Sequence, residues 1–540
     1  MTRTLAVALS FTVAACRPSP VLPPPARAPV VLVILDGVGL AAPGPGNAVT
    51  KAMAARPRGF LSRALGSAAL QTIALDASGT CVGLDPDHDG NSEAGHNNLC
   101  NGDVVVHHQR FIRQLLADGG VDASAPLQDA MTRAKENGRP LHLIVPLADR
   151  SSAGDYRDAL EIVRLALARG VPRLQLHGLC NGRSRHSCVE MAGELQTAMG
   201  ERGGFASIAG VDHCFSRTGA TAEVRACVGT MRAPRTGRER SLAEILAPVA
   251  ANVEAQLGLP PQAVRGSTPL ADSDDVILLP YRRDITVGIL RTLRHRPRDD
   301  APADNAGPIV TTLAALDSRR RYDDDPKLRL ALPRGDGGGL LHRRLAAAGI
   351  RELRIAETDK AAHVTYFCDA DDSADGPTYA RFHPPAASRD LRAAPCLQSR
   401  EAVARAVHAL AKNEADFILM NLPNGDLLGH TGDLEATVQG LVCVDDLLGE
   451  LAAAASDRGA WLFVTADHGN AEEMLVNGTP DRNHSKNPVP FIAVAPSGVE
   501  PVTLQRAATP PCVGRVTWTV LDALGLPFAP GRSLIVRPAP

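Results

Sequence analysis

The sequence predicts an α/β fold, because apolar runs of strand length alternate with amphipathic segments of helical length along most of the 540 residues. Three apolar runs, at 30–35, 417–420 and 461–464, are unbroken, which is typical of strands buried on both faces of a parallel sheet. Each run is followed by carboxylate or imidazole side chains. Ligands of open α/β sheets bind beyond the carboxyl ends of the strands, so these positions predict a functional site.

Two changes in organisation predict how the chain divides. Residues 29–106 have the strand, loop and helix pattern that opens an α/β domain, and residues 107–334 form a second alternating unit. The glycine-rich segment that follows indicates a hinge, because no Lys-Ser or Lys-Thr pair completes a phosphate loop there. Asp36 and the later candidate residues share one strand-end pattern. We therefore expect 29–106 and 335–540 to form one discontinuous domain, into which 107–334 is inserted.

Composition excludes several classes of partner. The hydrophobic content of 44% suffices for large cores, and the net charge of −2 offers no electrostatic basis for binding nucleic acid. No apolar stretch approaches the roughly 20 residues that a membrane span requires. The predicted partner is a small anionic substrate that meets a local group of Arg side chains.

Residues 1–28 are predicted to be a leader outside the folded domains. The mostly apolar stretch from Leu5 to Ala15 resembles the core of a signal peptide, and residues 13–16 resemble a bacterial lipoprotein cleavage box with Cys16 as a lipid anchor. A disordered leader or a mis-assigned start is the alternative, so export stays open at this point. Ten of the eleven cysteines remain without Cys16, an even number compatible with disulfides of undetermined connectivity.

Candidate metal ligands follow the three apolar runs. They are Asp36 after the first run, Asp426 and His430 after the second, Asp467 and His468 after the third, and His484 further along. Carboxylate combined with imidazole suits Mn²⁺ or Zn²⁺, whereas Mg²⁺ and Ca²⁺ prefer oxygen ligands. The set is large enough for two ions, and two-metal sites clamp the attacking and leaving oxygens of a phosphoryl group. These residues therefore predict phosphoryl transfer or hydrolysis.

Ser92 is the candidate nucleophile. It lies in the polar segment 90–96, and a serine hydroxyl requires a metal ion or a base before it becomes nucleophilic. A phosphoserine at this position would divide one transfer into two steps. The competing interpretation is a helix cap formed by Asn91 and Ser92, with Glu93 in the first turn.

Together these segments resemble the 2,3-bisphosphoglycerate-independent phosphoglycerate mutases of the alkaline phosphatase superfamily. The resemblance runs from about Val30 to about Ser533 and rests on residues 35–37, 90–96, 430–435, 465–470 and 487–491. It implies an alkaline-phosphatase-like sandwich domain with an inserted phosphotransferase domain. It also implies a cytoplasmic, monomeric isomerase of glycolysis and gluconeogenesis that uses two Mn²⁺ or other divalent ions. One ion would be held by Asp426, His430 and His484, and the other by Asp36, Ser92, Asp467 and His468.

By the same resemblance, cationic side chains would bind phosphoglycerate, since guanidinium groups bind carboxylate and phosphate in bidentate fashion. The matching positions are Arg183, Arg217, Arg282 and Lys360. Three positions depart from the family: Ser184 replaces its acid/base Asp, and Val211 and Ile285 replace Arg. The Gly-Gly-Val-His-Ser-His segment of the family is also replaced, near residues 150–155.

The departures leave two functional hypotheses. The preferred one is a mutase that interconverts 3-phosphoglycerate and 2-phosphoglycerate through phosphoserine at Ser92, with Asp155, His186 or His213 compensating for the missing Asp. The alternative is a diverged metal-dependent phosphohydrolase or phosphotransferase, favoured by export, in which water or another acceptor takes the phosphoryl group. A non-catalytic remnant is disfavoured, because all seven candidate metal ligands are present.

Overall fold

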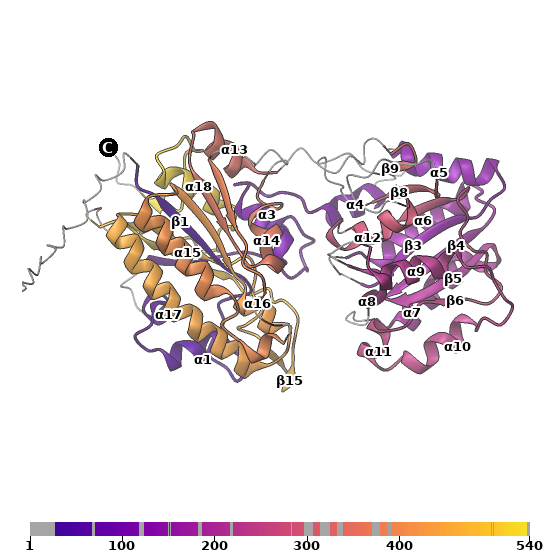
Figure 1. The fold of residues 1–540 in the computed structure, drawn as a ribbon, viewed down its shortest axis with the longest axis horizontal. Helices are drawn as coiled ribbons and strands as arrows, with labels where there is room; N and C mark the ends of the chain where they lie inside the picture. Colours follow the sequence, from indigo (N-terminus) through magenta and orange to yellow (C-terminus); the bar gives the residue numbers. More distant parts are fainter. Residues whose placement is uncertain are drawn as a thin grey trace, which may run out of the picture.

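Two lobes make up the protein, and each is built on a seven-stranded sheet (Figure 1). The computed structural model describes residues 27–66, 71–117, 124–149, 151, 153–181, 186–216, 220–281, 283–295, 306–313, 325–331, 338–369, 378–386, 388, 390–497, 499 and 502–536. The predicted leader, including Cys16, lies outside these residues apart from its last two positions. Among the helices of the described residues, none has the length and apolarity needed to cross a membrane.

The first lobe contains a mixed sheet with the strand order β11-β10-β12-β1-β13-β16-β2. Its three central strands are parallel and fully buried: β1 (Val30–Leu35), β12 (Phe417–Leu422) and β13 (Trp461–Thr465). Burial on both faces explains their unbroken apolar sequences. The sheet continues on one side through β10 (Glu352–Ile355) and β11 (Tyr379–Phe382), and on the other through the antiparallel strands β16 (Val489–Val494) and β2 (Gln71–Leu75).

Helices pack on this sheet in two groups. One group consists of α1 (Ala48–Ala55), α15 (Ser399–Lys412) and α17 (Leu434–Arg458), which pack against one another and against β12 and β13. The other includes α3 (Ser92–Leu99) and α18 (Arg515–Ala523), with α18 packed on β1. The long helix α17 has a defined start and end, because the Asp433 side chain accepts a hydrogen bond from Ala436 N and Gly459 adopts a left-handed conformation.

The second lobe contains a sheet with the order β6-β5-β4-β3-β7-β8-β9. Its parallel strands are β3 (Leu141–Leu147), β4 (Leu174–Cys180), β5 (Gly203–Gly210), β7 (Asp275–Leu278), β8 (Ile309–Thr312) and β9 (Leu328–Leu330), and β6 (Gln262–Ala263) is antiparallel. Alternation along β3 places Leu143 and Ile144 in different apolar clusters. One cluster contains residues of α6 (Tyr156–Ala168) and α7 (Cys188–Met199), and the other residues of α9 (Ala222–Arg232) and α12 (Arg283–Leu293). Both faces of the sheet are therefore covered.

The predicted α/β class is confirmed. The first sheet takes strands from residues 30–75 and from 352–494, and the second takes strands only from the segment between them. The domain boundaries at 106/107 and 334/335 stay predictions, and residues 332–337 lie outside the described part of the chain.

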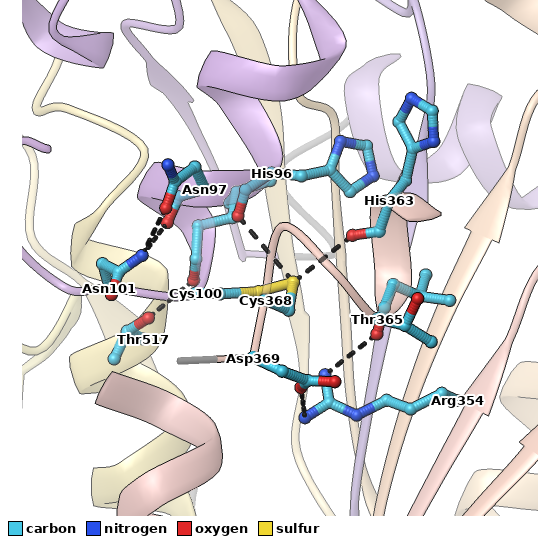
Figure 2. Close-up of a disulfide and its surroundings, with 12 residues drawn as sticks. His96, Asn97, Cys100, Asn101, Arg354, His363, Thr365, Cys368, Asp369 and Thr517 are labelled. Atoms are coloured by element: carbon cyan, nitrogen blue, oxygen red, sulfur yellow. Dashed lines mark hydrogen bonds and ion pairs between the residues drawn. A yellow bond between two sulfur atoms is a disulfide. The ribbon is translucent and has the colours of Figure 1, made fainter. Parts of the chain in front are cut away.

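In the described part of the chain, four disulfides join cysteines that are 13 to 431 positions apart. They are Cys81–Cys512, Cys100–Cys368 and Cys396–Cys443 in the first lobe and Cys214–Cys227 in the second. Figure 2 shows Cys100, the C-cap of α3, bonded to Cys368, which follows α14 (Ala361–Val364). This bond fastens the C-terminal end of α3, while Ser92 lies at the other end of the same helix.

Candidate metal centre

The six predicted Asp and His ligands converge at the carboxyl edge of the first sheet. Asp36 directly follows β1, and Asp467 and His468 follow β13. The other three are Asp426 in α16 (Asn424–Gly429), its C-cap His430, and His484 before β16. Their ligand atoms form two groups, Asp426/His430/His484 and Asp36/Asp467/His468, and within each group all ligand atoms lie within 4.8 Å of one another. Adjacent parallel strands end at one edge, which is why residues so distant in sequence meet.

The first group directs two imidazole nitrogens at one carboxylate. His430 Nε2 lies 3.1 Å from Asp426 Oδ1, and His484 Nε2 lies 3.2 Å from the same oxygen. The Nδ1 atoms of these histidines lie 2.6 Å from Arg482 O and 2.8 Å from Gly90 O. A carbonyl only accepts, so both Nδ1 atoms carry hydrogen and both Nε2 lone pairs remain for a cation. Burial and the neighbouring His468 lower the pKa of His484 to about 4, which keeps this ligand neutral.

The second group is completely buried. His468 Nε2 lies 3.4 Å from both Asp36 Oδ1 and Asp467 Oδ2. Within the described residues, neither of these carboxylate oxygens accepts a hydrogen bond. Buried carboxylate oxygens without such partners are costly, and a cation at this point would satisfy them. Burial and the charge of Asp467 raise the pKa of Asp36.

Lys360 lies between the two groups. Its Nζ atom is 2.9 Å from Asp36 Oδ2 and 2.7 Å from Asp426 Oδ2. Burial opposes its charge, but the two carboxylates outweigh burial and raise the pKa of Lys360 above its ordinary value. The resemblance implied that Lys360 binds substrate, and the structure places its ammonium group among the predicted metal ligands.

Ser92 is the first residue of α3. Asn91 is the N-cap and accepts a hydrogen bond from Ala94 N at 2.9 Å, so the cap and the nucleophile are two different residues. Ser92 Oγ lies 3.0 Å from His468 Nε2. A Cβ atom at Gly95 would lie 2.3 Å from Asp467 O, so the close approach of α3 to the end of β13 requires glycine there. The hydroxyl thus lies beside the second ligand group and at a helix N-terminus, where negative charge is favoured.

Two buried residues contact the ligand carboxylates, a third binds the backbone beside them, and none was singled out from the sequence. His96 Nδ1 bonds Ser92 O at 2.9 Å and lies 3.1 Å from Asp467 Oδ2 as an ion-pair contact, and Asn421 Nδ2 donates to Asp36 Oδ2 at 2.9 Å. Glu472 accepts hydrogen bonds from Gly39 N at 2.8 Å and from Asn470 N at 2.9 Å. His96 lies within the segment 90–96 that marks the nucleophile, but no local pattern distinguishes Glu472 from a surface carboxylate. His96 also packs edge-on against His363 near the Cys100–Cys368 bond (Figure 2).

The predicted substrate-binding arginines are not placed by the structure. Arg183, Arg217 and Arg282, together with Ser184, lie outside the described residues. Val211 begins the short helix α8 (Val211–Cys214), and Ile285 is buried in α12.

Of the groups predicted to compensate for the missing Asp, two are occupied by structural contacts. Asp155 is the buried N-cap of α6, and its Oδ2 atom accepts a hydrogen bond from Arg113 at 2.7 Å. His213 Nε2 lies 3.1 Å from Gly258 O, so this nitrogen is bound to the backbone. His186 differs, because its ring is half-exposed and, among the described residues, only its Nδ1 atom is held, at 2.6 Å from Asp149 Oδ2.

Comparisons with known proteins show what this chain is similar to. A family model described as the metalloenzyme superfamily matches residues 28–527. The 2,3-bisphosphoglycerate-independent phosphoglycerate mutase of Thermomicrobium roseum is 33% identical to this chain, over 95% of this chain and 99% of that protein. The enzyme of the same name from Moorella thermoacetica is 31% identical, over 94% and 98%. The crystal structure of Leishmania mexicana phosphoglycerate mutase, determined at low cobalt concentration, has the same fold, with a TM-score of 0.78, 24% identity and coverage of 96% and 99%.

Proposed function

Because this chain belongs to the 2,3-bisphosphoglycerate-independent phosphoglycerate mutases, an isomerase family within the metalloenzyme superfamily, we propose that it interconverts 3-phosphoglycerate and 2-phosphoglycerate. The observation that carries this proposal is the position of Ser92 Oγ, 3.0 Å from His468 Nε2 and beside two groups of candidate ligands. A phosphoserine at Ser92 would hold the phosphoryl group between its departure from one glycerate oxygen and its arrival on the other.

The donor set suits two divalent cations, and we assign Mn²⁺ to it because each group combines carboxylate with imidazole. Asp426, His430 and His484 would hold one ion, and Asp36, Ser92, Asp467 and His468 the other. When bound, the two ions would neutralise phosphoryl oxygens and lower the pKa of the Ser92 hydroxyl.

The residues of the chain would supply the remaining steps. Ser92 Oγ attacks phosphorus, and the bond to the first glycerate oxygen breaks as that oxygen takes up a proton. The second glycerate hydroxyl then loses its proton and attacks the phosphoserine, which releases Ser92. The N-terminal end of α3 favours the phosphoryl charge throughout, and Lys360 holds two of the carboxylates in place.

The second candidate is a diverged phosphohydrolase or phosphotransferase, and the disulfides support it. Such bonds persist in oxidising compartments, whereas phosphoglycerate is a cytoplasmic metabolite in the family that the chain resembles. Apolar side chains at Val211 and Ile285, where the family has Arg, also weaken the case for an unchanged substrate. Under this alternative, the protein acts outside the cytoplasm on another small phosphorylated molecule.

The deciding experiment incubates unreduced, purified protein with Mn²⁺ and 3-phosphoglycerate and follows 2-phosphoglycerate and free phosphate separately. The mutase proposal predicts that 2-phosphoglycerate forms without a stoichiometric amount of free phosphate. Phosphate release without isomer would contradict it and support the alternative. Ser92→Ala should abolish either activity while the protein stays folded, and Ser456→Ala, at an exposed hydroxyl outside the site, is the matched control.

A further inference from the structure

We propose that His186, oriented by Asp149, is the general acid and base that exchanges a proton with the substrate hydroxyls during phosphoryl transfer. The inference rests on the proposed function, because transfer between Ser92 and an alkyl hydroxyl requires a proton to be given and later removed. It concerns the second lobe, whereas the metal ligands and Ser92 all belong to the first.

Asp149 holds the imidazole of His186 in one orientation, in which the imidazole can act as a base. Asp149 follows β3 and His186 follows β4, and these strands are adjacent and parallel, so both residues lie at one edge of the sheet. The Asp149 side chain is 2% exposed and the His186 side chain 44% exposed. Because a carboxylate only accepts, His186 Nδ1 must donate across the 2.6 Å contact. The bond fixes the tautomer and the orientation of the ring and leaves Nε2 to act on a ligand.

No other hydrogen bond to His186 is found in the part of the chain that the structure describes. The ring nitrogens of the first-lobe histidines have different surroundings from those of His186. In His430, His484 and His468, Nδ1 faces a backbone carbonyl and Nε2 faces the candidate ligand groups. With both ions bound, these imidazoles would be occupied and could not also accept a substrate proton.

Helices that follow the carboxyl ends of strands in the second sheet lie on the side of their lobe turned toward the first lobe (Figure 1). These helices are α8, which follows β5, and α12, which follows β7. On the first lobe, α3, α14 and α16 lie on the side turned toward the second (Figure 1). A substrate whose phosphoryl group meets Ser92 would therefore present its other end to the sheet edge of His186.

The proton balance closes over one cycle. Protonated His186 gives its Nε2 proton to the glycerate oxygen as Ser92 Oγ bonds to phosphorus and the phosphorus–glycerate bond breaks. Neutral His186 then takes the proton of the other hydroxyl as that oxygen bonds to phosphorus and the phosphorus–Oγ bond breaks. The imidazole returns to its starting state, so no further reactant is needed.

The test uses two phosphoryl donors that differ in their leaving groups. An alkoxide from 3-phosphoglycerate needs protonation, whereas 4-nitrophenyl phosphate releases a stable phenolate. With Mn²⁺ present, His186→Gln should lower turnover of 3-phosphoglycerate by about 10²- to 10⁴-fold, the usual contribution of a general acid–base. Release of 4-nitrophenolate in the first turnover, which forms phosphoserine and needs no proton, should change less than about 3-fold on the same principle. Imidazole added to His186→Gly should restore turnover of 3-phosphoglycerate selectively.

Two further variants separate catalysis from structure. Asp149→Asn should impair the alkyl substrate more than the aryl substrate, because Asp149 orients His186. His408→Gln, at an exposed histidine outside the site, is the matched imidazole control and should change neither. Equal losses on both donors, or no loss on 3-phosphoglycerate, would overturn the proposal. If the wild-type protein releases phosphate but forms no isomer, the mutase function fails, and the ratio of alkyl to aryl hydrolysis in His186→Gln still decides the role of His186.

Discussion

Lys360 Nζ contacts Asp426 Oδ2 at 2.7 Å in a site from which water is almost fully excluded. The same ammonium group reaches Asp36, so one lysine joins both groups of candidate ligands. Three buried carboxylates, those of Asp36, Asp426 and Asp467, face this single positive charge. The histidines are neutral when they bind metal, so the excess negative charge is what divalent cations would balance.

Replacing Lys360 by Met should therefore destabilise the metal-free protein far more than the metal-loaded protein. Removing one partner of a buried ion pair costs about 3–5 kcal/mol, because the remaining charge is left without compensation. Added Mn²⁺ should reduce this cost by at least half. Urea unfolding with chelator and with Mn²⁺ measures both values, and Lys51→Met, at an exposed position, is the control. An equal loss under both conditions would mean that Lys360 is not coupled to metal binding.

Loss of one ligand should remove one ion and leave the other. Asp426→Asn disrupts the group with His430 and His484, and Asp467→Asn disrupts the group with Asp36 and His468. Metal analysis after dialysis should find two ions per wild-type chain and one per variant. Asp457→Asn, on the exposed side of α17, should retain both. Loss of both ions from either variant would indicate a single coupled site.

A disulfide that closes a long loop should contribute more to stability than one that closes a short loop. Cys100–Cys368 closes a separation of 268 residues and Cys214–Cys227 one of 13. Loop-closure entropy predicts a loss of about 3 kcal/mol for the short loop and at least about 4.7 kcal/mol for the long one when both cysteines become Ser. Cys100 also ends the helix that begins at Ser92, so the first pair of substitutions should lower activity as well. Denaturant unfolding and the mutase assay measure the two effects, and the reverse order of stability would contradict the entropic account.

Acidification should destabilise the second lobe. Burial lowers the pKa of His177 well below its ordinary value, and burial lowers that of His142 despite Asp274 at 3.4 Å. The unfolded chain binds protons at these histidines below about pH 6.5, whereas the folded chain binds them only at lower pH. The free energy of unfolding should therefore be insensitive to them above pH 6.5 and fall by up to about 1.4 kcal/mol per pH unit for each histidine below it.

Replacing His177 by Gln removes one of these titrations. The dependence of the free energy of unfolding on pH between 6.5 and 4.5 should then be shallower than in the wild type, whatever the absolute stability of the variant. Identical slopes would show that His177 is protonated in the folded state.

The sequence by itself determined the α/β class and was sufficient to predict the candidate metal ligands. Unbroken apolar runs predict buried parallel strands, and the rule that ligands bind at strand ends depends only on residues near each end, so Asp36, Asp467 and His468 could be found locally. The four-residue spacing of Asp426 and His430 and the polar segment around Ser92 are also local patterns.

Only the tertiary structure decided which residues meet. Glu472 accepts a hydrogen bond from Gly39 across 433 positions of sequence, and the four disulfides join cysteines that no spacing pairs. The position of Lys360 among the candidate ligands depends likewise on strand order. The proposal of His186 rather than Asp155 or His213 depends on which polar atoms already form hydrogen bonds. These contacts arise because the sheet orders its strands differently from the chain, and that order is set by the packing of the whole core rather than by any short segment.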